Sequence, residues 1–160
     1  MHVIDIRLAD PAAPDLHPLI QANLMHGADA APAESNHTFG VEQLQGDDVR
    51  FWAAYDGATT VGCGALKSLS DGTAEVKSVY VSEAARGRGI ARQIMQHLAA
   101  AAQTTGITAL VLETGSDLLP EYDAARALYE RLGYTYCPPI PGYTEDPNSA
   151  FMRLNLTPGA

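Results

Sequence analysis

A turn between an extended apolar run and an amphipathic segment reads Arg86-Gly87-Arg88-Gly89-Ile90-Ala91. Its two glycines let the backbone turn sharply and approach a ligand without a Cβ in the way. The helix expected after the turn directs its unpaired N–H groups and the positive end of its dipole toward the same place. The stretch therefore predicts a binding site for a phosphate or pyrophosphate, to which Arg86, Arg88 and Arg92 add positive charge.

The spacing of the glycines excludes two common phosphate-binding motifs. The turn lacks the third glycine of the dinucleotide fingerprint, and it does not end in the Gly-Lys-Ser or Gly-Lys-Thr of a P-loop. The pattern Arg86-x-x-Gly89-x-Ala91 instead resembles the acetyl-CoA signature of the GCN5-related N-acetyltransferases (GNATs), which is written Gln/Arg-x-x-Gly-x-Gly/Ala.

Segments on both sides of the turn extend this resemblance. Upstream, Ala74–Val81 is similar to the fourth strand of the family, and downstream, residues 127–134 carry the Leu-Tyr…Gly-aromatic pattern of its late helix. The resemblance is clear in the second half of the chain and covers the first half only in the order of elements. It implies one acetyltransferase domain over residues 1–160, of mixed α/β class. Its central sheet would be mostly antiparallel, splayed between the fourth and fifth strands, and flanked by helices.

Composition limits the classes of function. The 160 residues suit one domain, and 46% hydrophobic and 18% charged residues are typical of a globular protein. With 19 acidic against 10 basic residues, the net charge is −9, which argues against nucleic acid or an anionic membrane as a partner. An acidic surface favours a cationic acceptor such as an amine.

Cysteine usage and the N-terminus predict a cytoplasmic protein. Cys63 and Cys137 lie far apart and form no Cys-x-x-Cys pair, so we expect reduced, packed thiols. The first residues lack a positively charged lead into a long apolar run, and no apolar run reaches membrane-spanning length. The histidines show no metal-ligand spacing, so no metal is expected.

Hydrophobic periodicity predicts the order of the elements. Strands are expected at residues 2–8, 50–55, 59–69, 73–81, 107–113, 134–137 and 150–156. Helices are expected at residues 11–29, 41–44, 87–104 and 122–132. This mixed α/β order is the one that the acetyltransferase resemblance implies.

The resemblance also assigns residues to the cofactor. In the family, the exposed backbone of the fourth strand pairs with the pantetheine arm of acetyl-CoA, and amides of the turn bind its pyrophosphate. The residues implied here are Val79, Tyr80, Val81, Arg86, Gly87, Arg88, Gly89, Ile90, Ala91 and Arg92. An asparagine that often contacts the cofactor is replaced in this chain by Tyr122.

Two residues are implied for proton transfer. Tyr129 is the expected general acid, because the family commonly places a tyrosine hydroxyl here, near the thioester sulfur, and a phenol can protonate a departing thiolate. Its other interpretation is a packed core aromatic. Glu75 is the expected general base, although Lys77 on the same strand face could pair with it in a salt bridge. Glu113, at the end of the central strand, is a rival base or a water holder.

The acceptor pocket is expected from two loops. Glu34, Ser35 and His37 form a polar cluster in the first, and Tyr143 belongs to a second near the C-terminus. Bacterial GNATs of uncharacterised substrate look similar around both segments. Solvated loop residues are the other interpretation.

Three functions fit these observations to different degrees. The first is an N-acetyltransferase in which a primary amine of a small molecule or protein directly attacks acetyl-CoA in a ternary complex. The second is a non-catalytic acyl-CoA-binding sensor or subunit, which needs neither Tyr129 nor Glu75. The third is a phosphate-binding α/β domain unrelated to CoA. Edge strands near the C-terminus make a homodimer an expectation.

Overall fold

A computed structural model describes residues 3–30 and 37–157. One seven-stranded sheet runs in the order β1-β2-β3-β4-β5-β7-β6. The strands are β1 (Ile4–Leu8), β2 (Val49–Asp56), β3 (Thr59–Ser68), β4 (Ala74–Val81), β5 (Ala109–Gly115), β6 (Thr135–Cys137) and β7 (Ser149–Asn155). The helices are α1 (His17–Ala30), α2 (Val41–Leu44), α3 (Ile90–Thr104) and α4 (Asp123–Arg131), with 3₁₀ turns η1 (Pro14–Leu16), η3 (Glu83–Ala85) and η4 (Pro120–Tyr122).

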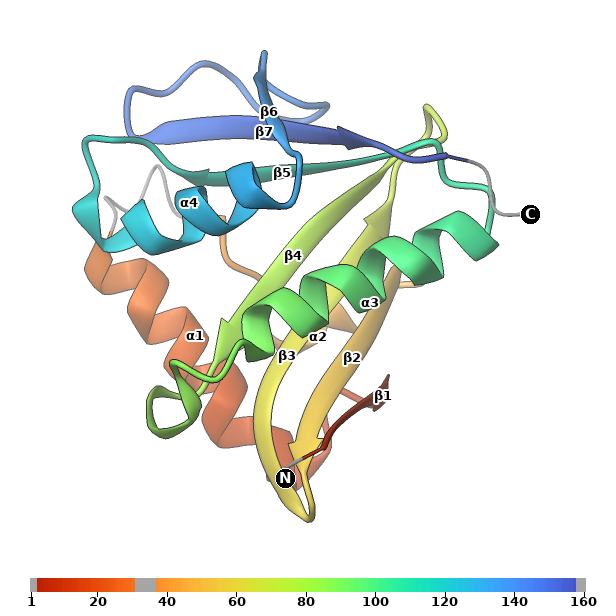
Figure 1. The fold of residues 1–160 in the computed structure, drawn as a ribbon, viewed down its shortest axis with the longest axis vertical. Coiled ribbons are helices and arrows are strands. Elements are labelled where there is room, and N and C mark those ends of the chain that lie inside the picture. Colours follow the sequence, from red (N-terminus) through yellow and green to blue (C-terminus); the bar gives the residue numbers. More distant parts are fainter. Residues whose placement is uncertain (1–2, 31–36, 158–160) are drawn as a thin grey trace.

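The sheet is mixed and splayed, which confirms the expected fold class. Every neighbouring pair of strands is antiparallel except β4 and β5. These two pair only near their starts, where Ala74 lies opposite Leu110 and Glu75 opposite Val111. Figure 1 shows β4 and β5 meeting at one end and diverging toward their carboxyl ends.

Helices cover both faces of the sheet because successive side chains of a strand point to opposite faces. On β2, Trp52 and Ala54 join the core beneath α3, whereas Phe51 and Ala53 join the core beneath α1 and α2. Figure 1 shows α3 crossing β2, β3 and β4 on one face. No helix in residues 3–30 or 37–157 combines the length and apolarity that a membrane crossing needs.

Two glycines on β3 let α3 pack closely against the sheet. A Cβ on Gly62 would lie 2.9 Å from the Ile94 side chain, and one on Gly64 would lie 2.7 Å from it. Such distances are shorter than real packing contacts. The close approach fixes where the first turn of α3 lies relative to the end of β4.

Two expected helix boundaries differ from the structure. The central helix begins at Ile90 rather than Gly87, because Gly87 and Gly89 adopt φ values of +82° and +76°, outside the right-handed helical region. The first helix begins at His17 rather than at residue 11. Part of the segment expected to begin this helix, Pro14–Leu16, forms a 3₁₀ turn instead, because proline lacks the N–H that a continuous helix would need there.

Candidate active site

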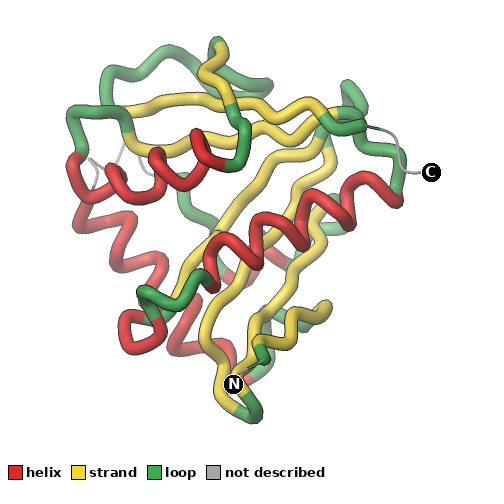
Figure 2. The backbone as a smooth tube through the Cα atoms, viewed as in Figure 1, coloured by secondary structure: helices red, strands yellow, loops and turns green. Residues whose placement is uncertain are grey.

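The turn between β4 and α3 presents unpaired amides. Gly89 caps α3 in the left-handed conformation, and the Gln93 amide is the first of the helix to find a main-chain acceptor, the Gly89 carbonyl at 3.2 Å. Among the described residues, no group accepts a hydrogen bond from the amides of Ile90, Ala91 or Arg92. Figure 2 shows this connection as a short helical turn flanked by loop. Amides of this kind at a helix start are able to donate to an anion, and the binding of a phosphate group here stays a prediction.

The three arginines of the turn have different surroundings. Arg86 donates to the Val81 carbonyl at 3.2 Å and lies over the Tyr80 ring, 5.4 Å from its centroid. Arg88 pairs with Asp56 at 3.0 Å, while Arg92 is exposed on α3. A cavity of about 410 Å³ lies beside the turn and is walled on the other side by α4.

A second cavity, of about 420 Å³, occupies the splay between β4 and β5. The β4 residues Val79, Tyr80 and Val81 line it, and the pairing of their backbone with pantetheine stays a prediction. Ser78, beside them, has φ +57° at a register shift between β3 and β4. Its buried hydroxyl has no hydrogen-bond partner among the described residues, although it borders this cavity. Strain and an unpaired polar group at one position are features that functional sites retain.

Tyr129 lies on α4 and lines the same cavity. Its ring also contacts the core, with its centroid 5.9 Å from that of Tyr134. Tyr129 thus both packs against the core and borders the cavity, and its role as general acid stays a prediction. Burial, and after it the neighbouring Tyr122, raises the pKa of the Tyr129 phenol to about 12. The hydroxyl is therefore protonated near neutral pH and able to donate.

Glu75 is part of a buried hydrogen-bonded cluster. Its carboxylate accepts from Lys77 at 3.0 Å and from the Tyr143 hydroxyl at 2.6 Å, and Lys77 also donates to Tyr143 at 2.8 Å. The Glu75 and Lys77 side chains are 3% and 6% exposed. The salt bridge that the sequence left open thus forms, and Glu75 also borders the cavity between β4 and β5. Burial, followed by the hydrogen bond to Glu75, raises the pKa of Tyr143.

Glu113 is held by a second cluster across the splay. His37 Nδ1 lies 2.8 Å from both carboxylate oxygens, and the Ser149 hydroxyl donates to one of them at 2.8 Å. The His37 ring packs edge-on against Tyr143, with centroids 4.9 Å apart, so the two clusters touch. His37 and Tyr143, two residues expected at the acceptor pocket, therefore come together with Glu113, whereas Glu34 and Ser35 lie outside the described residues.

Comparison with known proteins identifies the family. A family model for the acetyltransferase (GNAT) domain matches residues 47–136, more than half of the chain. The chain belongs to the GNAT family. GNAT proteins use acyl-CoA donors and act on amine acceptors, so this chain is an acyltransferase.

Individual GNAT relatives match along nearly the whole chain. The uncharacterized N-acetyltransferase YsnE of Bacillus subtilis (strain 168) is 38% identical over 151 residues, which cover 94% of this chain and 99% of the relative. A crystal structure of an acyl-CoA N-acyltransferase from Klebsiella pneumoniae has a TM-score of 0.80 and 29% identity, covering 97% of this chain and 99% of that one. A Bacillus subtilis acetyltransferase in complex with CoA shares the fold, with a TM-score of 0.72, 15% identity and coverage of 97% and 100%.

The residues of this GNAT chain fit a CoA ligand. The amides at the start of α3 and the Ser78 hydroxyl are unpaired donors among the described residues, and the two cavities both reach Val81, Arg86 and Ala91. In the described part of the chain no cluster of three or more His, Cys, Asp or Glu side chains could hold a metal ion. Cys63 and Cys137 are free thiols.

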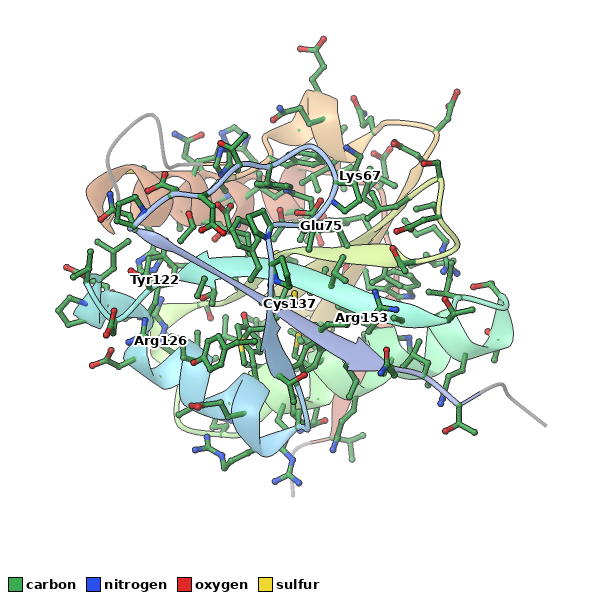
Figure 3. All side chains as sticks on the ribbon, turned by 90° about the horizontal axis from the view of Figure 1, so that it is seen from above. Lys67, Glu75, Tyr122, Arg126, Cys137 and Arg153 are labelled. Carbon is green, nitrogen blue, oxygen red and sulfur yellow. The ribbon has the colours of Figure 1, made fainter. Side chains whose placement is uncertain are left out.

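Sequence reasoning missed several residues of this region of the GNAT fold. Ser149 carried no motif, and nothing in the sequence marks Ser78 as a residue of positive φ. Arg126 donates to the carbonyls of Gly115 and Ser116 at 2.7 and 2.6 Å and so holds the loop after β5. Figure 3 labels Arg126 and Tyr122, both at the start of α4.

Tyr122 stands where the family often has asparagine. Its ring packs against the backbone of Gly115 and lies beside His26, with the centroids of the Tyr122 and His26 rings 5.6 Å apart. Because a Cβ on Gly115 would overlap the Tyr122 ring, the glycine is what makes room for this aromatic. The Tyr122 ring also lines the cavity between β4 and β5, so an aromatic wall replaces the expected amide contact.

Proposed function

We propose that the protein is an N-acetyltransferase that moves the acetyl group of acetyl-CoA to a primary amine of a small molecule or protein, by direct attack in a ternary complex. The observation that carries this proposal is one cavity bordered by a protonated phenol, Tyr129, and by two carboxylates, Glu75 and Glu113. Acetyl transfer from a thioester to an ammonium needs one group to take a proton from nitrogen and another to give a proton to the departing sulfur.

Cofactor binding is proposed for the end of β4 and the turn that follows. The backbone of Val79 and Val81, with Tyr80 between them, would pair with the pantetheine arm, because β5 has diverged from β4 there. The amides from Gly87 through Arg92 would bind the pyrophosphate. When bound, acetyl-CoA supplies an activated thioester carbonyl.

Proton transfers are proposed for side chains that border the cavity. Tyr129 would donate its phenolic proton to the sulfur as the carbon–sulfur bond breaks. Glu75 or Glu113 would take the proton of the acceptor ammonium, directly or through a water, which frees the nitrogen lone pair to form the new carbon–nitrogen bond. Each candidate carboxylate already accepts two or more hydrogen bonds, so its position is fixed before the acceptor arrives.

Location, assembly and domain organisation extend the proposal. Two free thiols support a reducing compartment such as the cytoplasm, which fractionation of cells that express the tagged protein would test. We propose a single domain over residues 1–160. We also propose a homodimer that forms through the edge strand β6, where the side chain of Tyr136 is exposed. Light scattering coupled to size-exclusion chromatography measures the mass in solution and so distinguishes a monomer from a dimer.

The test of the function is release of CoA thiol from acetyl-CoA over a panel of primary amines and peptides with free N-termini. We expect at least one amine to support turnover. Tyr129→Phe should lower kcat by about 10²-fold or more with little change in acetyl-CoA affinity, because its proton is needed only as the thiolate leaves. Tyr134→Phe is the matched control: its ring lies next to Tyr129, but its hydroxyl does not border the cavity, so turnover should persist.

One outcome would favour the non-catalytic sensor or subunit instead. If acetyl-CoA binds tightly and no amine in the panel accelerates thiol release, then acyl transfer is not what the cavity performs. Nucleotide affinity equal to CoA affinity in a thermal-shift assay would favour the third function, a phosphate-binding domain.

A further inference from the structure

The side chain of Glu113 is oriented by partners from two distant parts of the chain. His37 comes from the loop before α2, and Ser149 from the start of β7. Their bonds to the Glu113 carboxylate are each 2.8 Å. The carboxylate is 13% exposed, whereas the imidazole is 38% exposed. A shielded carboxylate thus orients a more accessible imidazole that borders the same cavity as Tyr129.

One ring nitrogen of His37 takes no part in these hydrogen bonds. Nδ1 is engaged by Glu113, and Nε2 has no hydrogen-bond partner among the described residues. A neighbouring carboxylate favours the tautomer in which Nδ1 carries the proton, which leaves a lone pair on Nε2. The opposite carboxylate, Glu75, is engaged differently: a buried ammonium and a phenol both donate to its Oε2 atom. Those two donors occupy Oε2 and leave this oxygen less accessible to an incoming ammonium.

We propose that His37 and Glu113 form a base relay, in which Nε2 of His37 accepts the proton of the acceptor ammonium while Glu113 holds Nδ1–H and Ser149 holds Glu113. The relay rests on the proposed N-acetyltransferase function and assigns its proton acceptor. His37 is the residue that touches the acceptor, and Glu113 and Ser149 are positioning residues.

The protons balance in this scheme. The ammonium gives one proton to Nε2, which becomes an imidazolium whose Nδ1–H bond to Glu113 is strengthened by charge. The nitrogen lone pair then forms the bond to the acetyl carbon, and the carbon–sulfur electron pair leaves on sulfur. Sulfur takes a proton from Tyr129, and Tyr129 recovers one from the newly bonded nitrogen. The imidazolium finally releases its proton to water.

The groups around His37 come from three elements. Glu113 on β5 contacts Nδ1, and Tyr143 from the loop before β7 contacts the ring edge-on. Behind Tyr143 lie Glu75 and Lys77 of β4, which balance one another as an ion pair. Within residues 3–30 and 37–157, the charge in contact with the imidazole is therefore the carboxylate of Glu113.

The first experiment measures the tautomer of His37 in the free protein, before any substrate is added. Long-range ¹H–¹⁵N spectra distinguish the two neutral tautomers and the imidazolium, and His37→Gln identifies the resonances. At pH 8 we expect a neutral ring with the proton on Nδ1. A proton on Nε2, or an imidazolium that persists at this pH, would overturn the relay, because neither form can accept at Nε2.

The second experiment measures turnover with the amine found in the panel. His37→Ala should lower kcat by about 10²-fold or more and leave the acetyl-CoA dissociation constant unchanged. Glu113→Gln keeps a hydrogen-bond acceptor for Nδ1–H but removes the charge, so we expect a loss of about tenfold or more together with an altered His37 spectrum. His17→Ala, an exposed histidine at the start of α1, is the control and should match the wild type.

Failure of the relay and failure of the proposed function give different results. Wild-type turnover that persists in His37→Ala overturns the relay and leaves the acetyltransferase intact. Absence of turnover with every amine, despite acetyl-CoA binding, overturns both. The same assay compares the two carboxylates. A larger loss of kcat in Glu75→Gln than in Glu113→Gln would assign the role of proton acceptor to Glu75 and overturn the relay.

Discussion

Replacing Lys77 by methionine should destabilise the protein strongly, because it leaves a buried carboxylate without its cation. Methionine has a similar length and fills the space of the lysine stem, so the change isolates the charge. The pair is joined at 3.0 Å, and both side chains are almost fully shielded, at 6% and 3% exposure. Removing one partner of such a pair costs about 3–5 kcal/mol.

The remaining hydrogen bond sets where in this range the loss should fall. Tyr143 still donates to Glu75 in the variant, so we expect the lower end, about 3 kcal/mol. For a chain of this size, that corresponds to a fall in Tm of about 10 °C. Urea unfolding followed by circular dichroism measures the free energy. The double variant Lys77→Met with Glu75→Gln should recover most of the loss, since no unpaired charge is left.

Lys67→Met is the matched control. Lys67 lies directly opposite Glu75 in the β3–β4 register, yet its side chain is half-exposed and forms no salt bridge within the described residues. Figure 3 labels both residues. This control should cost less than about 1 kcal/mol. A Lys77→Met variant as stable as the control would show that the cluster does not depend on its buried cation.

Three further predictions concern packing and titration. Gly64→Ala should lower the free energy of unfolding in urea by about 1–3 kcal/mol, because the new methyl group would lie 2.7 Å from the Ile94 side chain. Gly40→Ala is the control, since its methyl group would meet only an ordinary contact at 3.8 Å. Equal stability of the two variants would contradict the close packing of α3. The pKa of Tyr129 is about 12 in the folded state and about 10 when unfolded, so the unfolded state loses this proton first. The stability that this phenol contributes is present below pH 10 and falls by up to about 3 kcal/mol between pH 10 and pH 12, and Tyr129→Phe should show a shallower fall over that window. Burial raises the pKa of the Cys63 thiol to about 12. A thiol reagent at pH 8 should therefore label Cys137 in the native protein and Cys63 only after unfolding. Rapid labelling of Cys63 in the native Cys137→Ser variant would disprove its burial.

The sequence predicted the order of elements and the turn, because each carries a local signal. Glycines at positions 87 and 89 and the apolar spacing of Ile90, Ile94 and Leu98 are properties of neighbouring residues. Helix starts were less accurate because the conformation of each glycine or proline decides them. The family resemblance supplied the splay of the sheet, which no local pattern encodes.

The two hydrogen-bonded clusters could be predicted only in part. Glu75 and Lys77 share a strand face, so their pairing was one of two readings of the sequence. Tyr143 reaches them from 66 residues or more away, and His37 reaches Glu113 from 76 residues away. Contacts between loops at such separations depend on the packing of the whole sheet. Ser78 is harder still, because its positive φ opposes the preference of its residue type.

The proposed acetyl transfer depends on binding of the CoA pyrophosphate by the amides at the start of α3, and titration calorimetry on Gly89→Glu measures that binding. Gly106→Glu is the matched control, since Gly106 has nearly the same φ, +78° against +76°, and lies at the opposite end of α3. We expect CoA affinity to fall by at least about 100-fold in Gly89→Glu, because a carboxylate would stand against the diphosphate, and to stay near the wild-type value in Gly106→Glu. Wild-type affinity in Gly89→Glu would mean that the pyrophosphate does not bind at the start of α3.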